Sequence, residues 1–200
     1  MADRYDRFVT LAANEIEGVD YRICVMKRAS PIAIVAPHGG LIEPGTSQIA
    51  AAIAADRFSL YCFEGLNRAN SARLHITSAR FDEPRALALV SAAEVAIGVH
   101  GRKDGGDDAS IWVGGLHESL RDAIYGALAS SGFKAKPVGD DHRLAGRDPA
   151  NICNRCRGGA GVQLELPKTL RDALVREAGR RAALAAAVRD ALERAAPPSA

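Results

Sequence analysis

The segment Ile32-Ala-Ile-Val-Ala-Pro-His38-Gly-Gly-Leu-Ile-Glu43-Pro-Gly-Thr-Ser47 sets the fold class of this chain. Its first five residues are apolar, which predicts a buried strand, and a helix is expected to begin near Thr46 or Ser47. A strand that runs through a glycine-containing loop into a helix is typical of α/β proteins with a largely buried sheet.

The rest of the chain repeats this alternation of Val/Ile-rich runs with Ala/Leu-rich stretches of helical period. Strands are expected near Tyr21 to Met26, Ile32 to Ala36, Ser59 to Phe63, Val95 to Val99, Ile111 to Val113 and Val162 to Leu166. Helices are expected over Thr46 to Ala55, Pro84 to Ala92, Leu116 to Ser130 and Leu170 to Ala195. Thr169 should cap the last helix and Pro197-Pro198 should end it. The two long polar loops, Arg102 to Asp108 and Gly139 to Arg157, are expected near a functional site.

Composition narrows the class of protein. Two hundred residues with 48% hydrophobic content predict a single domain over 1–200, with a flexible tail at about 196–200. A formal net charge of +2 and scattered arginines argue against nucleic-acid binding. The sequence contains no stretch apolar enough for a bilayer span and no visible signal peptide, so a cytoplasmic protein is expected. Four cysteines are too few for a secreted disulfide scaffold.

Three residues at predicted strand ends suggest a metal site. His38 and Glu43 follow one strand, and the strand Val95-Ala-Ile-Gly-Val ends in His100. Ligands of open α/β sheets gather at the carboxyl ends of strands, and the glycines after His38 let the chain fold back toward one point. Two histidines and a glutamate are a known ligand set of catalytic zinc.

A carboxylate is also predicted to face this site. In Val162-Gln-Leu-Glu165-Leu, strand alternation places Gln163 and Glu165 on one face and the apolar residues on the other. Buried polar side chains are costly unless they have partners or a task. Glu165 is therefore the candidate general base for hydrolysis of an amide.

Each of these residues has an ordinary alternative. A strand-end histidine is more often structural, Glu43 could be a solvated first-turn acid, and Glu165 could pair with an arginine. His75, His117 and His142 are expected to be structural or exposed, and Trp112 is expected in the core or at a rim. The motifs of serine hydrolases, P-loop NTPases and dinucleotide-binding proteins are absent from the sequence. From the residues alone, the metal-site and structural interpretations both stay open.

Four motifs carry a resemblance to a known family. They are Ala36-Pro-His38-Gly-Gly-x-Ile-Glu43-Pro-Gly-Thr-Ser47, His75-Ile-Thr-Ser78 with Phe81-Asp-Glu-Pro84, Val99-His100-Gly101, and Gly161-Val-Gln-Leu-Glu165. Together they resemble the poly-γ-glutamate hydrolases of bacteria and their phages, from about Tyr21 to Leu166. The resemblance implies a zinc-carboxypeptidase-like, three-layer α/β sandwich with a mixed, mostly parallel sheet between helices.

The resemblance also implies roles for single residues. Zn²⁺ would be held by His38, Glu43 and His100, with Glu165 as the catalytic residue. Thr77, Ser78 and Gln163 would approach the substrate or the oxyanion. By analogy with zinc carboxypeptidases, Asn154 and Arg155 would bind a substrate carboxylate, with a solvated Arg155 as the alternative.

The implied substrate is an anionic γ-linked polyglutamate or γ-glutamyl peptide. A cleft for it should present cations, and the candidates are Arg80, Arg102, Lys103, Arg155 and Arg157. The alternatives are another zinc amidase or carboxypeptidase acting on cell-wall γ-glutamyl peptides or N-acyl amino acids, and a non-catalytic module that binds metal or an anionic polymer. Release by phage or cell lysis would bring such an enzyme to an extracellular polymer. Cys153 and Cys156 depart from the family pattern and are expected to be two reduced thiols outside the mechanism.

Overall fold

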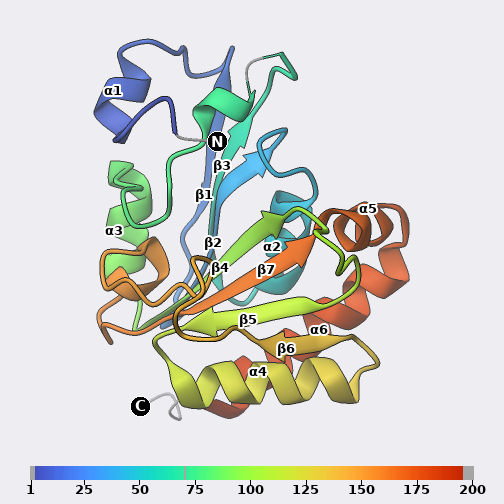
Figure 1. Cartoon of the computed structure of the whole chain (residues 1–200). Coiled ribbons are helices and arrows are strands. Elements are labelled where there is room, and N and C mark those ends of the chain that lie inside the picture. Colours follow the sequence, from blue (N-terminus) through green and yellow to red (C-terminus); the bar gives the residue numbers. More distant parts are fainter. Residues whose placement is uncertain (1–2, 70, 196–200) are drawn as a thin grey trace.

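The computed structural model describes residues 3–69 and 71–195 and is built around one seven-stranded sheet. The strands are β1 (Tyr21–Met26), β2 (Ile32–Gly40), β3 (Ser59–Gly65), β4 (Val95–Arg102), β5 (Ile111–Gly115), β6 (Ala135–Pro137) and β7 (Val162–Pro167). Their order is β1-β3-β2-β4-β7-β5-β6. The four central strands run parallel, while β1 and β5 pair antiparallel to β3 and β7 (Figure 1). The predicted mixed, mostly parallel sheet is therefore confirmed.

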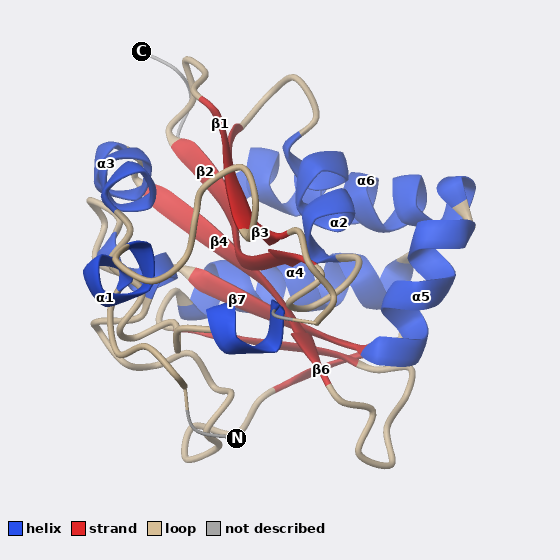
Figure 2. Ribbon diagram, turned by 90° about the horizontal axis from the view of Figure 1, so that it is seen from above, coloured by secondary structure: helices blue, strands red, loops and turns tan. Residues whose placement is uncertain are grey.

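Helices cover both faces of the sheet, which gives three layers (Figure 2). One face packs against α2 (Thr46–Ala54), α4 (Glu118–Ser130), α5 (Lys168–Arg176) and α6 (Ala178–Ala195). The other face carries α1 (Phe8–Ala12), α3 (Pro84–Ala92) and the 3-10 turns η1 (Ser71–Leu74) and η2 (Ile152–Arg155). Within the described ranges, no helix combines the length and the apolar character needed to cross a bilayer.

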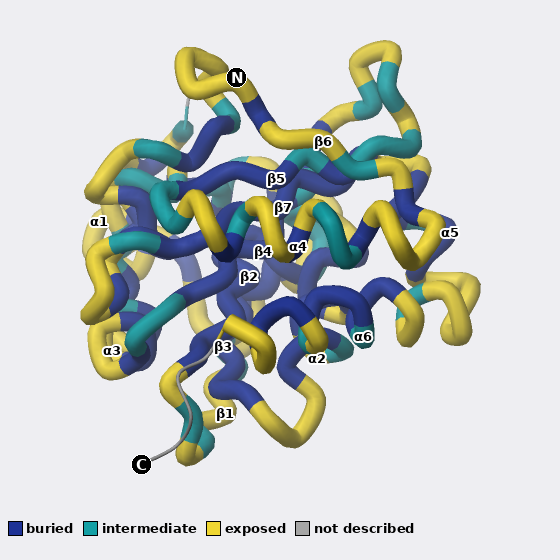
Figure 3. Tube along the Cα trace, turned by 90° about the horizontal axis from the view of Figure 1, so that it is seen from below, coloured by how far each residue is buried: buried dark blue, intermediate teal, exposed yellow. Residues whose placement is uncertain are grey.

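Two hydrophobic cores result, one on each face. Along β7, Val162, Leu164 and Leu166 belong to the core beneath α2 and α4 to α6. Gln163 and Glu165 point to the opposite face, as the strand alternation predicts. Figure 3 shows that the central strands are buried along most of their length, whereas exposed segments lie at the periphery.

The six predicted strands are all present, and the two that carry histidines extend further than expected. His38 and His100 lie inside β2 and β4 and do not follow them. The short strand β6 was not predicted, because its three residues end in a proline and are mostly exposed. The helix α1 was not predicted either, since it spans five residues with one buried position.

The predicted C-terminal helix is two helices with a break at Glu177. The Arg181 side chain donates to the carbonyls of Leu174 and Val175 and so satisfies the end of α5. Thr169 is not the cap: it lies in the first turn of α5 and donates its backbone N–H and its hydroxyl to Asp104. The predicted tail at 196–200 and the Pro197-Pro198 stop lie outside the described residues.

Candidate metal centre

The site lies at the carboxyl ends of the parallel strands, where β2 and β4 deliver His38 and His100. Both side chains are buried, with 2% of each residue exposed. The chain turns back after β2 at Gly40, whose φ of +62° and close approach to the Gly65 carbonyl leave no room for a Cβ. This turn returns Glu43 to the site, where its carboxylate accepts a hydrogen bond from the Gly101 N–H at 2.7 Å.

The ligand atoms of the three residues converge. The Nδ1 atoms of His38 and His100 are 3.2 Å apart, His38 Nδ1 is 3.4 Å from one Glu43 oxygen, and His100 Nδ1 is 4.0 Å from the other. Two nitrogens bound to one tetrahedral zinc at about 2.0 Å would lie about 3.3 Å apart. The spacing of the His38 and His100 nitrogens therefore fits two ligands of one zinc ion.

The second ring nitrogen of His38 fixes its tautomer. His38 Nε2 lies 2.8 Å from the carbonyl oxygen of Ile76, which can accept but not donate. Nε2 therefore carries a proton, and Nδ1 is the atom that presents a lone pair toward His100 and Glu43 when the ring is neutral. Two buried imidazoles and a carboxylate thus face one point, and these are ligand types that zinc binds.

Burial and neighbouring groups shift the pKa values of the residues in this site. Burial opposes the charged form of Glu43, but the neighbouring His38 outweighs it and lowers the pKa of that carboxyl group to about 2. Burial and the charge of His38 lower the pKa of His100 to about 3, so its imidazole is neutral near pH 7. Burial opposes the charged form of His38, but Glu43 outweighs it and raises the pKa of His38. A carboxylate and a neutral imidazole are the states that bind metal, so an ion bound here would displace a proton from His38.

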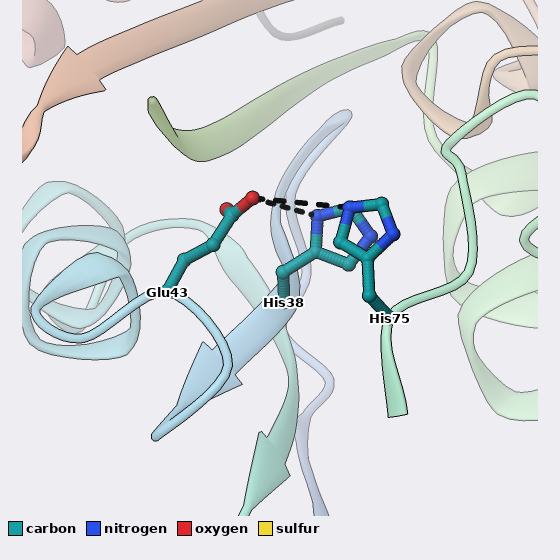
Figure 4. Close-up of side chains that lie close together, drawn as sticks. All are labelled: His38, Glu43 and His75. Atoms are coloured by element: carbon teal, nitrogen blue, oxygen red, sulfur yellow. Dashed lines mark ion pairs between the residues drawn. The ribbon is translucent and has the colours of Figure 1, made fainter. Parts of the chain in front are cut away.

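His75 joins this site, which corrects the expectation that it is structural or exposed. Its ring stacks on His38 with centroids 4.0 Å apart, and its Nε2 is 4.0 Å from Glu43 (Figure 4). His38, Glu43 and His75 each offer a ligand atom within 4.8 Å of the others. This contact could not be predicted from the sequence, because His75 follows η1 in an irregular segment without periodicity.

Glu165 lies beside His100 in the sheet, since the two are register partners of the parallel strands β4 and β7. A chain of amides holds it: Asn151 donates to Gln163 at 2.8 Å, and Gln163 donates to Glu165 at 2.9 Å. Burial first, and then the nearby Glu43, raise the pKa of Glu165 well above its usual range. Asn151 was not predicted, because its irregular segment has no period that reveals which side chains face inward.

These residues line one cavity of about 910 Å³, a volume suited to a small ligand or a segment of a polymer. Thr77 and Ser78 line it too, and Ser78 Oγ is 3.4 Å from His100 Nε2. Trp112 lies at its wall as a half-buried residue, and the exposed His142 packs against that ring edge-on.

Two of the predicted substrate-binding residues do not line this cavity. The buried Asn154 side chain donates to the carbonyls of Gly146 and Asp148 and accepts from Gly161, so it holds two loop segments together. The exposed Arg155 donates to the Phe81 carbonyl. The structure does not bring either side chain to the metal ligands.

Of the five cationic residues predicted to face the substrate, only two line the cavity. Arg102 and Lys103 line the cavity. Arg80 pairs with Asp3 instead. Arg157 pairs with Glu94, the residue before β4, and thus lies at the opposite end of that strand.

The cysteines remain outside the site. Cys153 and Cys156 are free and buried. Burial raises the pKa of Cys153 well above its ordinary value, which disfavours the reactive thiolate. His117 is the N-cap of α4, since its ring nitrogen accepts from the Leu120 N–H.

Several solved structures share the fold of this chain. A bacteriophage poly-γ-glutamate hydrolase has a similar structure, with a TM-score of 0.90 and 34% identity over 96% of this chain and 98% of that one. The zinc-free apo structure of YndL has a TM-score of 0.91 and 33% identity over 98% of this chain and all of that one. An N-formylglutamate amidohydrolase from Ralstonia eutropha shares the fold, with a TM-score of 0.54 and 13% identity over 88% of this chain and 98% of that one.

The chain also has sequence relatives among the UPF0714 proteins of Bacillus subtilis. YndL of Bacillus subtilis is 38% identical over 86% of this chain and 67% of its own length. The SPβ prophage-derived protein YoqZ of that bacterium is 38% identical over 82% of this chain, which spans 59% of that relative. The family model described as poly-γ-glutamate hydrolase matches residues 5–192. This chain therefore belongs to the poly-γ-glutamate hydrolase family.

Proposed function

We propose that this protein is a zinc-dependent hydrolase that cleaves γ-glutamyl amide bonds, with poly-γ-glutamate as its substrate. The observation that carries the proposal is the convergence of His38, Glu43 and His100 beside the buried Glu165. Family membership and the similarity to a phage poly-γ-glutamate hydrolase support the choice of substrate.

His38, Glu43 and His100 would hold the zinc, and His75 stands beside them. When bound, zinc would supply a Lewis acid that lowers the pKa of water and polarises an amide carbonyl. The buried setting of Glu165 raises its pKa and so makes its carboxylate a stronger proton acceptor than an exposed glutamate. Glu165 takes the proton of the attacking water and later delivers it to the leaving nitrogen.

The neighbouring polar groups have distinct tasks in this proposal. The Gln163 amide is engaged by Asn151 on one side and Glu165 on the other, so it orients the carboxylate. The hydroxyls of Thr77 and Ser78, which line the cavity, would donate to the developing oxyanion.

The test of the general base is Glu165→Gln, which keeps the shape of the side chain and its hydrogen bonds. The loss of kcat on γ-linked polyglutamate should be about 10²-fold to 10⁴-fold, because the variant cannot accept a proton. Zinc content, measured by atomic emission, should stay at the wild-type value. Glu94→Gln, which removes a carboxylate at the other end of β4, is the matched control. Full activity in zinc-loaded Glu165→Gln would falsify the assignment.

The test of the substrate compares cleavage of γ-linked polyglutamate, α-linked polyglutamate, muropeptides and N-acyl amino acids, with product size as the readout. The wild-type protein should shorten γ-linked polyglutamate and leave α-linked polyglutamate intact. Cleavage of muropeptides or N-acyl amino acids in preference to the polymer would identify another zinc amidase. Bound zinc without any cleavage would identify a binding module.

A further inference from the structure

One loop contacts both histidines of the metal centre from outside. In this loop, residues 75–80, the Ile76 carbonyl accepts from His38 Nε2 at 2.8 Å and Ser78 Oγ lies 3.4 Å from His100 Nε2. The His75 ring stacks on the His38 ring at an interplanar angle of 26°. The loop therefore meets the ring nitrogen of each histidine that faces away from Glu43, and these contacts set how both rings are oriented.

The loop has no helix or strand of its own between η1 and α3, so its position must come from tertiary contacts. Asp3 provides three of them. One carboxylate oxygen accepts from His75 Nδ1 at 2.7 Å, and the other accepts from the Thr77 N–H at 2.7 Å and from Arg80 Nη2 at 2.9 Å. The Asp3 side chain is only 7% exposed. A further contact comes from the Ile152 N–H, which donates to the Ser78 carbonyl.

The contact with His75 also sets a tautomer. Because the Asp3 carboxylate is an acceptor, it keeps the proton of His75 on Nδ1. His75 Nε2 then presents its lone pair toward the side of the site where Glu43 lies, 4.0 Å away. Without Asp3, the Thr77 N–H and the half-buried His75 Nδ1–H would lose their partner, and the loop would lose its attachment to the segment that precedes α1.

We propose that Asp3 is a positioning residue of the metal centre, which sets metal affinity by fixing the loop at 75–80 against His38 and His100. This inference rests on the proposed zinc site. Asp3 contacts His75 directly, but it reaches His38 and His100 only through the loop and touches neither. Groups that orient metal-bound histidines typically change affinity by about tenfold to a hundredfold when they are removed.

The experiment measures zinc affinity of the metal-free protein by competition with a chromophoric chelator. Asp3→Ala should bind zinc about tenfold to a hundredfold more weakly than wild type. Asp3→Asn should weaken binding in the same direction, because it keeps the size but loses the charge and one acceptor atom. Asp6→Asn is the matched control, since the exposed Asp6 makes one long hydrogen bond, to Thr10 at 3.3 Å. Its zinc affinity should equal that of wild type.

Thermal unfolding in excess chelator separates positioning from folding. The metal-free Asp3→Asn protein should unfold at a temperature close to that of metal-free wild type. A lower unfolding temperature with zinc affinity within about fivefold of wild type would mean a structural role and would overturn the inference. If wild type itself binds no zinc, the proposed function fails as well, so the wild-type measurement tells the two failures apart.

Discussion

At the level of single residues, the cations that line the cavity are not equivalent. Arg102 pairs with Asp107, and Arg147 pairs with Glu118 and Asp140. Lys103 and Arg143 are exposed at the cavity, and among the residues that the structure describes neither has a carboxylate partner. These two side chains are therefore free to meet the α-carboxylates of an anionic polymer.

Charge reversal at Lys103 or Arg143 should weaken binding of γ-linked polyglutamate and leave the chemical step intact. Exposed ion pairs contribute up to about 1 kcal/mol, so KM should rise roughly fivefold for each variant at low salt, with kcat near wild type. The difference should shrink as salt increases. Steady-state kinetics at two ionic strengths measures both effects. Lys134→Glu makes the same charge change away from the cavity and should behave as wild type. A fall in kcat with unchanged KM would contradict this assignment.

Which site residues could be predicted depends on where they lie in the chain. His38, His100 and Glu165 lie in strands, whose alternation and parallel direction indicate a common edge and face. His75 and Asp3 lie in irregular segments, and their contact joins positions 72 residues apart. No periodicity marks such a contact, so neither residue could be placed at the site from sequence.

At the level of elements, the helix α5 stabilises the carboxyl ends of the strands that carry the site. Its buried Arg171 donates to the carbonyls of Leu166 at 3.1 Å, of Arg102 at 3.4 Å and of Pro44. One guanidinium thus joins the ends of β7 and β4 to the loop that returns Glu43. Gly101 is required beside it, because a Cβ there would lie 2.5 Å from the Arg171 Cζ.

Replacement of Arg171 by methionine should destabilise the metal-free protein by about 2–4 kcal/mol, because three carbonyls lose their donor in a buried setting. Urea unfolding in excess chelator measures this free energy. Arg176→Met changes an exposed arginine of the same helix and should cost less than about 0.5 kcal/mol. Equal stability of Arg171→Met and Arg176→Met would show that the three carbonyls need no donor from α5.

The element boundaries show what local patterns can predict. The strand predicted over Val162 to Leu166 is present as β7 with the predicted faces, since Gln163 and Glu165 alternate with apolar residues. The break at Glu177 could not be predicted, because the sequence keeps a helical composition across it. The end of α5 is capped by the Arg181 side chain, which lies in the next helix. The antiparallel direction of β5 could not be foreseen either, since it depends on how the chain between β4 and β5 reverses.

At the level of the whole molecule, the site draws on segments that are distant in sequence and adjacent in the sheet. β2 and β4 supply the histidines, β7 supplies Glu165, and the loop after η1 covers them. The α/β class followed from the alternation of strand and helix patterns. The strand order β1-β3-β2-β4-β7-β5-β6 could not be predicted in this way. β7 lies between β4 and β5, and no local sequence pattern indicates that position.

This arrangement predicts that metal binding stabilises the entire fold. An ion held by β2, the following loop and β4 would bind the folded state and would find no such site in the unfolded chain. At a free zinc concentration a thousandfold above Kd, the gain should be about 4 kcal/mol. For a chain of 200 residues, each kcal/mol shifts Tm by roughly 2–4 °C, so zinc should raise Tm by roughly 8–16 °C over chelated protein. Calorimetry with and without chelator measures the shift. His38→Ala removes one proposed ligand, so zinc should raise the Tm of this variant far less than that of wild type. An equal rise in Tm would mean that the stabilising zinc binds somewhere other than the carboxyl ends of the strands.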